Sequence, residues 1–192
     1  MFLKKLFKSI KISSFLMLIS IIPSKSISDI SLKTLFKNDG KLIFIRHANA
    51  PGNGDPENFD ISDCGTQRNL DYNGILDSKK IGVFFKEINI PIDKVLSSEW
   101  CRCKDTANYA FGKFEVKNFL NSFYSQKFYH NKSKQIKDLK KYVNNWDGKK
   151  NLVFITHFVV ISEVLNLSAY QAEIIISDIN FNVLARKKIP IN

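Results

Sequence analysis

Two of the histidines in this chain follow directly after short apolar runs of the kind that form buried strands. Arg46 and His47 come after the run 42–45, and His157 comes after the run 152–156. A neutral imidazole can act as a nucleophile, and a guanidinium beside it can bind an anion. The sequence has only three histidines. Two of them at matching positions are better explained by a shared catalytic task than by chance.

These side chains must be positioned by a sheet, and the pattern along the chain predicts one. Runs of β-type residues alternate with helical apolar spacing, which indicates an α/β fold: a three-layer sandwich with a mostly parallel central sheet. The expected strands are 42–46, 94–97 and 152–156, the expected helices are 73–88, 100–111, 132–143 and 159–167, and a late hairpin is expected from 172–176 and 183–189. Residues 118–131 show no clear period and are expected to form a loop. In open sheets of this type, ligands bind at the carboxyl ends of the strands.

A second arginine, Arg102, lies just beyond the run that ends at Ser97, in the first turn of an expected helix. Arg46, His47, Arg102 and His157 would then converge on one edge of the sheet, where helix N-termini add backbone N–H donors for an anion. Such a cationic pocket suits a phosphoryl group. A histidine can attack phosphorus to form a covalent phosphohistidine, and the arginines can stabilise the transition-state charge. This chemistry needs no metal ion or other cofactor.

An ordered series of motifs around these residues resembles the histidine phosphatase superfamily, also called the phosphoglycerate mutase-like family. Its Arg-His-Gly nucleophile motif resembles residues 46–48, and its phosphate-contacting asparagine has the offset of Asn53. The further matches are Leu-Thr-x-x-Gly to residues 70–74, Ser-Ser-x-x-x-Arg-Ala-x-x-Thr-Ala to residues 97–107, and Thr-His to residues 156–157. Chance would have to supply every spacing at once over residues 42 to 167, so the ordered set is far more specific than Arg-His alone.

The resemblance implies the fold of this family and a role for each matching residue. By it, His47 is the nucleophile that becomes phosphorylated. Arg46 and Arg102 clamp the phosphoryl oxygens, His157 gives them a further hydrogen bond, and Asn53 assists. The implied function is a metal-independent phosphatase that releases phosphate from a small phosphorylated compound. Two alternatives stay open: an inactive module that binds phospho-ligands, and a phosphoglycerate mutase-like phosphotransferase.

The sequence departs from the family pattern at the acid that protonates the leaving group. Mutase-type members carry a glutamate in the excursion after the second arginine, but this chain has no acid from 116 to 137. The phytase-like branch has an aspartate directly after the second histidine, where this chain has Phe158. Asp63, Glu99 and Glu163 are substitutes only by their proximity in the sequence. Because a general acid contributes about 10²–10⁴-fold, its absence favours a phosphoramidate or an acidic leaving group.

Three further residues are expected to have simple structural roles. Ala48 replaces the glycine of the family motif, and we expect its added Cβ, near the phosphate, to be tolerated. Arg68 is expected to be a surface charge, with an additional substrate contact as the alternative. His130 is expected to be a solvated surface residue.

The first 28 residues have the layout of a secretory signal peptide. A basic start is followed by the uncharged, apolar segment 12–24 and by small residues that offer a cleavage site. The apolar run is short for a transmembrane helix, which needs about 20 residues; an uncleaved anchor is the alternative. We therefore predict an exported, periplasmic protein with one mature domain over residues 29–192 and no membrane span after cleavage. Residues 54–70 and 100–103 also look like an exported bacterial branch of the family.

The leader contains five lysines and no acids, so removing it lowers the formal net charge from +11 to +6. Much of the remaining positive charge lies in one segment, at Lys127, Lys132, Lys134, Lys137, Lys140 and Lys141. Apolar residues at helical spacing accompany these lysines, which are therefore expected on the solvated face of an amphipathic helix. The alternative is that they attract an anionic substrate or surface. No recognition motif points to nucleic acid, and the oligomeric state stays open.

Three cysteines in an exported protein suggest one disulfide and one leftover thiol. Cys101 and Cys103 are too close in sequence to pair comfortably, so Cys64 is expected to bridge to one of them. No cluster of histidines and cysteines completes a four-ligand metal site. No signal marks any of the three thiols as an activated nucleophile.

Overall fold

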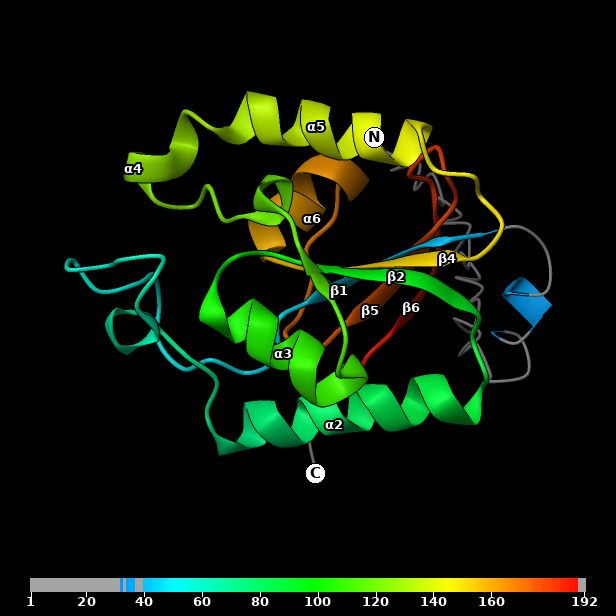
Figure 1. The fold of residues 1–192 in the computed structure, drawn as a ribbon, viewed down its shortest axis with the longest axis horizontal. Coiled ribbons are helices and arrows are strands. Elements are labelled where there is room, and N and C mark those ends of the chain that lie inside the picture. Colours follow the sequence, from blue (N-terminus) through cyan, green and yellow to red (C-terminus); the bar gives the residue numbers. More distant parts are fainter. Residues whose placement is uncertain (1–31, 33, 37–39, 190–192) are drawn as a thin grey trace, which may run out of the picture.

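The computed structural model describes residue 32, residues 34–36 and residues 40–189 (Figure 1). Its centre is a six-stranded sheet with the order β3-β2-β4-β1-β5-β6. The strands are β1 (Leu42–Arg46), β2 (Ile92–Ser97), β3 (Glu115–Val116), β4 (Asn151–Thr156), β5 (Ile174–Ser177) and β6 (Val183–Lys187). Strands β1 to β4 pair in parallel, whereas β5 runs antiparallel to both β1 and β6. The predicted mostly parallel sheet and late hairpin are confirmed.

Helices cover both faces of this sheet. In Figure 1, α2 and α3 lie on one side of the sheet and α5 and α6 on the other. The helices are α2 (Tyr72–Glu87), α3 (Cys101–Phe111), α4 (Gln126–Tyr129), α5 (Lys132–Asn144) and α6 (Phe158–Leu165), with short 3₁₀ turns η1 (Cys64–Thr66) and η2 (Asn118–Leu120). This arrangement confirms the predicted three-layer sandwich.

Alternate residues of the central strands build two separate cores. Ile43 and Ile45 of β1 join the cluster that includes residues of α2 and α3, whereas Leu42 and Phe44 join the cluster that includes residues of α5 and α6. Successive side chains of a strand point to opposite faces of its sheet. Because both faces are covered, β1 is continuously apolar rather than alternating, which is why the sequence run is so easily recognised.

The start of α2 is fastened to the loop that follows β1. The Asp71 side chain accepts a hydrogen bond from the Gly74 backbone N–H at 2.7 Å and another from Asn49 Nδ2 at 2.8 Å. A Cβ at Gly74 would lie 2.1 Å from the carbonyl oxygen of Asn49, so the close approach of helix and loop requires glycine. This contact gives a physical reason for the glycine at the end of the Leu70–Gly74 motif.

The segment 118–131 is more ordered than expected, because it contains η2 and α4. Gln135 of α5 explains part of this order: its side-chain Nε2 donates to the carbonyl oxygens of Asn118 and Asn121. Phe119 and Leu120 are buried in the core beneath α5. The prediction of a plain loop is wrong, since burial of irregularly spaced aromatic residues leaves no periodic signal.

The predicted leader, residues 1–28, lies outside the described residues. The expectations of export and of a mature domain over residues 29–192 therefore stay predictions. Within the residues that the structure describes, no helix is both long and apolar enough to cross a bilayer.

Candidate active site

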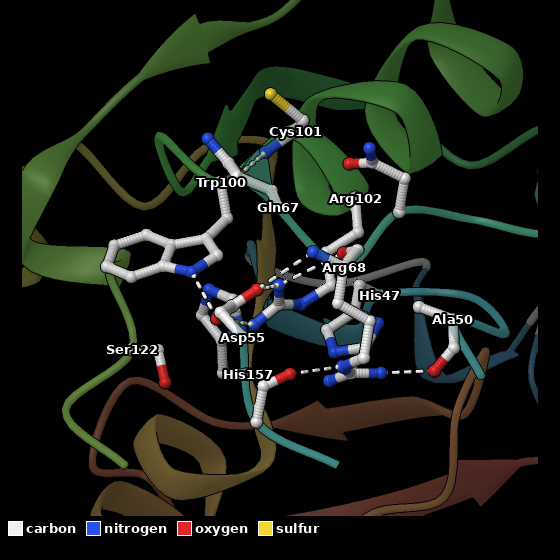
Figure 2. Close-up of polar contacts among 12 residues, drawn as sticks. His47, Ala50, Asp55, Gln67, Arg68, Trp100, Cys101, Arg102, Ser122 and His157 are labelled. Atoms are coloured by element: carbon white, nitrogen blue, oxygen red, sulfur yellow. Dashed lines mark hydrogen bonds and ion pairs between the residues drawn. The ribbon is translucent and has the colours of Figure 1, made fainter. Parts of the chain in front are cut away.

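The sheet brings the two predicted histidines together. β1 lies beside β4, with Arg46 opposite Thr156, and the backbone N–H of His47 continues the ladder by donating to the Thr156 carbonyl at 3.0 Å. The rings of His47 and His157 have centroids 5.5 Å apart. Both side chains are buried and appear side by side in Figure 2. The convergence of two strand ends is confirmed.

The predicted site residues line one cleft, which has a volume of about 280 Å³. Its lining includes all five of them, namely Arg46, His47, Asn53, Arg102 and His157. Asn53 is exposed, whereas Arg102 is only 3% exposed and the two histidines 2% each. Aromatic side chains form part of the wall, at Phe59, Trp100 and Phe128. The cleft therefore combines the buried Arg102 and two buried imidazoles with an aromatic wall.

The imidazole of His47 is held as one tautomer. Its Nδ1 lies 2.9 Å from the carbonyl oxygen of Ala48, and because a carbonyl can only accept, Nδ1 must carry the hydrogen. In the neutral ring, Nε2 then keeps its lone pair. Burial and, next, the positive charge of Arg102 hold the pKa of His47 well below its usual value. The ring is therefore neutral at neutral pH, the form in which it can act as a nucleophile.

The second histidine, His157, has a different set of partners. Its Nε2 lies 2.9 Å from Ser98 Oγ, and that hydroxyl donates its own hydrogen to Asn121 Oδ1 at 3.1 Å. Nε2 must therefore donate to Ser98, which leaves Nδ1 as the nitrogen that can take up a proton. Burial and the charge of Arg102 keep the pKa of His157 well below its usual value. An anion nearby would raise that pKa again.

Arg46 and Arg102 each donate hydrogen bonds to protein oxygens through terminal nitrogens of the guanidinium, while Nε makes none. Arg102 Nη1 and Nη2 donate to the Asp55 carboxylate at 2.6 and 3.2 Å, and Arg46 Nη1 donates to the carbonyl oxygen of Ala169 at 2.8 Å. In both arginines Nε is buried and has no hydrogen-bond partner. Because Nε and Nη2 form one edge of a guanidinium, each arginine keeps an edge suited to two parallel hydrogen bonds with an oxyanion.

One functional candidate was missed from the sequence, and a second, Arg68, was given a place near the substrate only as an alternative. Asp55, in the loop after β1, lines the cleft and pairs with Arg102. The expectation that Arg68 is a surface charge is wrong: it also lines the cleft, its Nε donates to the Gly54 carbonyl at 2.7 Å, and its Nη1 donates to the Ala50 carbonyl. The only sequence feature that could have pointed to these residues is the run of Gly, Pro and acidic residues directly after the Arg-His pair. It indicates a loop but does not show which part of the molecule the loop packs against.

The loop is fastened to the start of α3 by the disulfide. Cys64 pairs with Cys101, with 5.7 Å between the Cα atoms, which resolves the two pairings left open by the sequence. Gln67 Oε1 accepts a hydrogen bond from the Cys101 backbone N–H at 2.9 Å, so this helix-terminal donor is already used and cannot serve an anion. Cys103 is a free, buried thiol whose pKa burial raises to about 12. It stays protonated at neutral pH, which argues against a cysteine nucleophile.

The expected substitutes for the general acid do not reach the cleft. Asp63 accepts from the Gly65 backbone N–H at the start of η1, Glu99 accepts from the Asn121 side chain, and Glu163 pairs with Lys132 at 2.7 Å. The carboxyl groups among the lining residues are those of Asp55 and Glu57.

Ala48 also lies elsewhere than expected. It is fully buried in the hydrophobic core and does not belong to the cleft lining. The expectation of a Cβ near the phosphate is wrong, because the backbone turns into the core after His47. His130 is exposed, as predicted.

The described residues hold no group of three or more His, Cys, Asp or Glu side chains that could bind a metal ion. The lining instead includes three arginines, and Arg46 and Arg102 each keep a buried Nε–H without a hydrogen-bond partner. Such a donor set suits an oxyanion.

Comparison with solved structures places the fold among known ones. The chain is similar to the protein histidine phosphatase SixA complexed with tungstate, with 16% identity, a TM-score of 0.53, and coverage of 77% of this chain and 96% of that chain. It is also similar to a proposed alpha-ribazole-5'-P phosphatase from Escherichia coli, with 14% identity, a TM-score of 0.58, and coverage of 81% and 99%. A proposed phosphohistidine phosphatase SixA from Agrobacterium tumefaciens matches with 15% identity, a TM-score of 0.52, and coverage of 77% and 97%.

These solved structures belong to the histidine phosphatase superfamily, and the chain has their phosphoglycerate mutase-like fold. No protein-family model matches the sequence. No curated protein matches it either. At identities of 14 to 16%, the likeness concerns the fold.

Proposed function

We propose that this protein is a phosphohydrolase that acts through a covalent phosphohistidine on His47. One observation carries the proposal: a neutral imidazole with a fixed tautomer lies in the same cleft as two arginines, each with a buried Nε that has no partner. A phosphoryl group is the oxyanion that such a donor set fits. The motif series and the fold of the solved histidine phosphatases support the same assignment.

The proposed reaction has two steps. In the first, the Nε2 lone pair of His47 attacks phosphorus, and the bond from phosphorus to the leaving group breaks with its electron pair, so that the leaving group takes its proton from solvent. In the second, water attacks the phosphohistidine, the electron pair of the P–N bond returns to Nε2, and inorganic phosphate leaves with the protons of that water. Arg46 and Arg102 stabilise the charge on the phosphoryl oxygens in both steps. His157, protonated at Nδ1 when the anion enters, donates a further hydrogen bond, and Asn53 assists from the rim.

The cleft favours substrates whose leaving group needs little help from an acid. Burial raises the pKa of Asp55, but the hydrogen bond and charge of Arg102 outweigh burial and leave it below the usual value. Asp55 is therefore ionised and has no proton to give at neutral pH. The other lining carboxyl, Glu57, is exposed. We therefore propose a small phosphorylated compound, either a phosphoramidate or an ester with an acidic leaving group, and a reaction without a metal ion.

Phosphate release from a panel of compounds tests this proposal. The panel contains phosphoramidate, 4-nitrophenyl phosphate and an alkyl phosphate, with and without a metal chelator. We expect turnover that the chelator does not change, and a loss of at least about 10³-fold in His47→Asn. The exposed-histidine variant His130→Asn is the matched control and should keep wild-type activity.

Equal phosphate release by wild type and His47→Asn would remove the catalytic proposal. Because Asp55 is ionised, an inactive module that binds phospho-ligands is the second candidate. It predicts tight phosphate binding without turnover. Transfer of phosphate to a second hydroxyl, rather than to water, would instead indicate a mutase.

We also propose that the protein is exported to the periplasm and that residues 29–192 form the mature domain. The Cys64–Cys101 disulfide supports an oxidising compartment, and the leader-like residues 1–28 support export. Fractionation of cells followed by N-terminal sequencing tests this. Full-length protein in the cytoplasm with residues 1–28 intact would contradict it.

A further inference from the structure

A carboxylate from the loop after β1 organises the cleft. Asp55 Oδ1 and Oδ2 accept hydrogen bonds from Arg102 Nη1 and Nη2, and Oδ2 also accepts from Trp100 Nε1 at 3.0 Å. A fourth donor, the backbone N–H of Arg68, lies 3.1 Å from Oδ1. Figure 2 shows Asp55 between Trp100, Arg102 and Arg68. The carboxylate is thus fully engaged by donors from two separate parts of the chain.

These contacts determine which edge of Arg102 is available. A guanidinium has five N–H donors. Asp55 takes one from each terminal nitrogen, and the Arg68 carbonyl accepts a second from Nη1 at 3.2 Å. The remaining donors are Nε–H, which is buried without a partner, and the second hydrogen of Nη2. Those two point the same way, along the Nε/Nη2 edge, where one oxyanion can accept both.

We propose that Asp55 is a positioning residue, which holds the Nη1/Nη2 edge of Arg102 so that only its Nε/Nη2 edge meets the phosphoryl group. The inference rests on the proposed function. It gives a role to Asp55, which is not part of the motif series that supports that function. Arg102 is only 3% exposed. A buried guanidinium without Asp55 would turn toward other acceptors, or bind the anion through the wrong edge.

Two other roles for Asp55 are less consistent with the contacts. A general acid needs a proton at neutral pH, whereas this carboxylate accepts four hydrogen bonds, including two from a cation. In the other role, the Asp55 carboxylate would occupy the phosphate-binding position and leave it before each turnover. Leaving would break all four hydrogen bonds at once, whereas the Nε/Nη2 edge of Arg102 is already free to bind phosphate.

Trp100 makes the positioning network testable without removing charge. Its ring is packed against Phe59 at 5.1 Å and His157 at 5.3 Å between centroids, so Trp100→Phe keeps an aromatic wall while it deletes the hydrogen bond to Asp55. If Trp100 acts through Asp55, the two substitutions share one effect, and their energies do not add.

The experiment compares steady-state kinetics of wild type, Asp55→Asn, Trp100→Phe and the double variant. The substrates are 4-nitrophenyl phosphate and an alkyl phosphate. Asp60→Asn, which removes a carboxylate from an exposed residue of the same loop, is the matched control. Thermal unfolding verifies that each variant is folded. Misplacement of a clamp by about 1 Å costs about 100-fold.

We expect Asp55→Asn to lower kcat by about 10- to 100-fold, by the same factor on both substrates, with a smaller change in KM. Trp100→Phe should lower kcat less, and the double variant should be no slower than Asp55→Asn. Asp60→Asn should keep wild-type kinetics. If Asp55→Asn does not fold, Trp100→Phe alone must still lower kcat rather than raise KM.

Four results would overturn the inference and leave the proposed function standing. An unchanged or higher kcat in Asp55→Asn would mean that the carboxylate competes with phosphate. A loss confined to the alkyl phosphate would mean a general acid. A rise in KM alone would mean uniform binding, and additive losses in the double variant would mean independent structural effects. A wild type without turnover on either substrate would defeat the proposed function and this inference together.

Discussion

Positive charge is concentrated in two places on this molecule, and the two are organised differently. The cleft holds Arg46 at the carboxyl end of β1 and Arg102 in the first turn of α3, each with fixed oxygen partners. A shallow groove on α5 is lined by lysines instead, at Lys132, Lys137, Lys140 and Lys141. Of these, Lys137, Lys140 and Lys141 are exposed, while Lys132 pairs with Glu163. The two regions have a similar number of cations, but only in the cleft do hydrogen bonds to protein oxygens fix the direction in which the N–H groups point.

The difference is physical rather than numerical. Exposed ammonium groups are screened by water and salt and lose side-chain entropy when they bind an anion. The guanidiniums of Arg46 and Arg102 are already held by hydrogen bonds to protein oxygens, and their buried Nε–H groups, which have no partner, can gain hydrogen bonds from an oxyanion. The formal net charge of +11 is therefore a poor guide to the binding site. The placement of Arg46 at a strand end and of Arg102 at a helix start is a better one.

Substitutions in each of the two regions should separate them most strongly. Arg102→Lys keeps the charge but loses the Nε/Nη2 edge, so we expect kcat/KM to fall by about 10²–10³-fold. The double variant Lys137→Gln/Lys141→Gln removes two charges from the groove and should lower kcat/KM by less than about 3-fold, an effect that added salt abolishes. Equal losses from both variants in steady-state phosphate release would contradict the distinction.

The dependence of stability on pH should also separate buried from exposed histidines. The pKa values of His47 and His157 are lowered in the folded state, whereas unfolded histidine titrates near pH 6.5. Below about pH 6.5 the unfolded state binds more protons, so the free energy of unfolding falls as pH falls, by up to about 1.4 kcal/mol per pH unit for each buried histidine.

Urea denaturation at a series of pH values between about 5 and 7 measures this slope. His47→Asn should reduce the slope, because one buried histidine no longer contributes. His130→Asn exchanges an exposed ring and should keep the wild-type dependence. A slope that responds to His130→Asn and not to His47→Asn would contradict the burial of His47 and His157.

The elements that carry the histidines could be predicted, because a strand covered on both faces leaves an uninterrupted apolar run. Asp55 could not be predicted, and Arg68 was given a substrate contact only as the alternative, because their loop has no period and its path depends on contacts with α3. The disulfide could not be assigned from the sequence for the same reason, because the path of the loop decides whether Cys64 meets Cys101 or Cys103. Cys101 and Cys103 are two residues apart on a helix of 3.6 residues per turn and therefore face nearly opposite ways. Cys101 bonds with Cys64, while Cys103 lies 3.5 Å from His157 Nε2.

The sequence and the structure also differ on where the general acid should be sought. Residues near the motifs in sequence, such as Asp63, lie outside the cleft, and the carboxylate that reaches it is held ionised by Arg102. Proximity along the chain was therefore an unreliable guide, because the path of the loop after β1 brings Asp55 into the cleft and leaves Asp63 outside it.

The central claim is that His47 carries the phosphoryl group, and trapping the intermediate tests it most directly. Wild-type protein is mixed rapidly with phosphoramidate, quenched in alkali, digested and analysed by tandem mass spectrometry. The account predicts acid-labile phosphate on the peptide that contains His47, and none in His47→Asn. Turnover by wild type with phosphate on another residue, or with no phosphoenzyme under any quench, would contradict it.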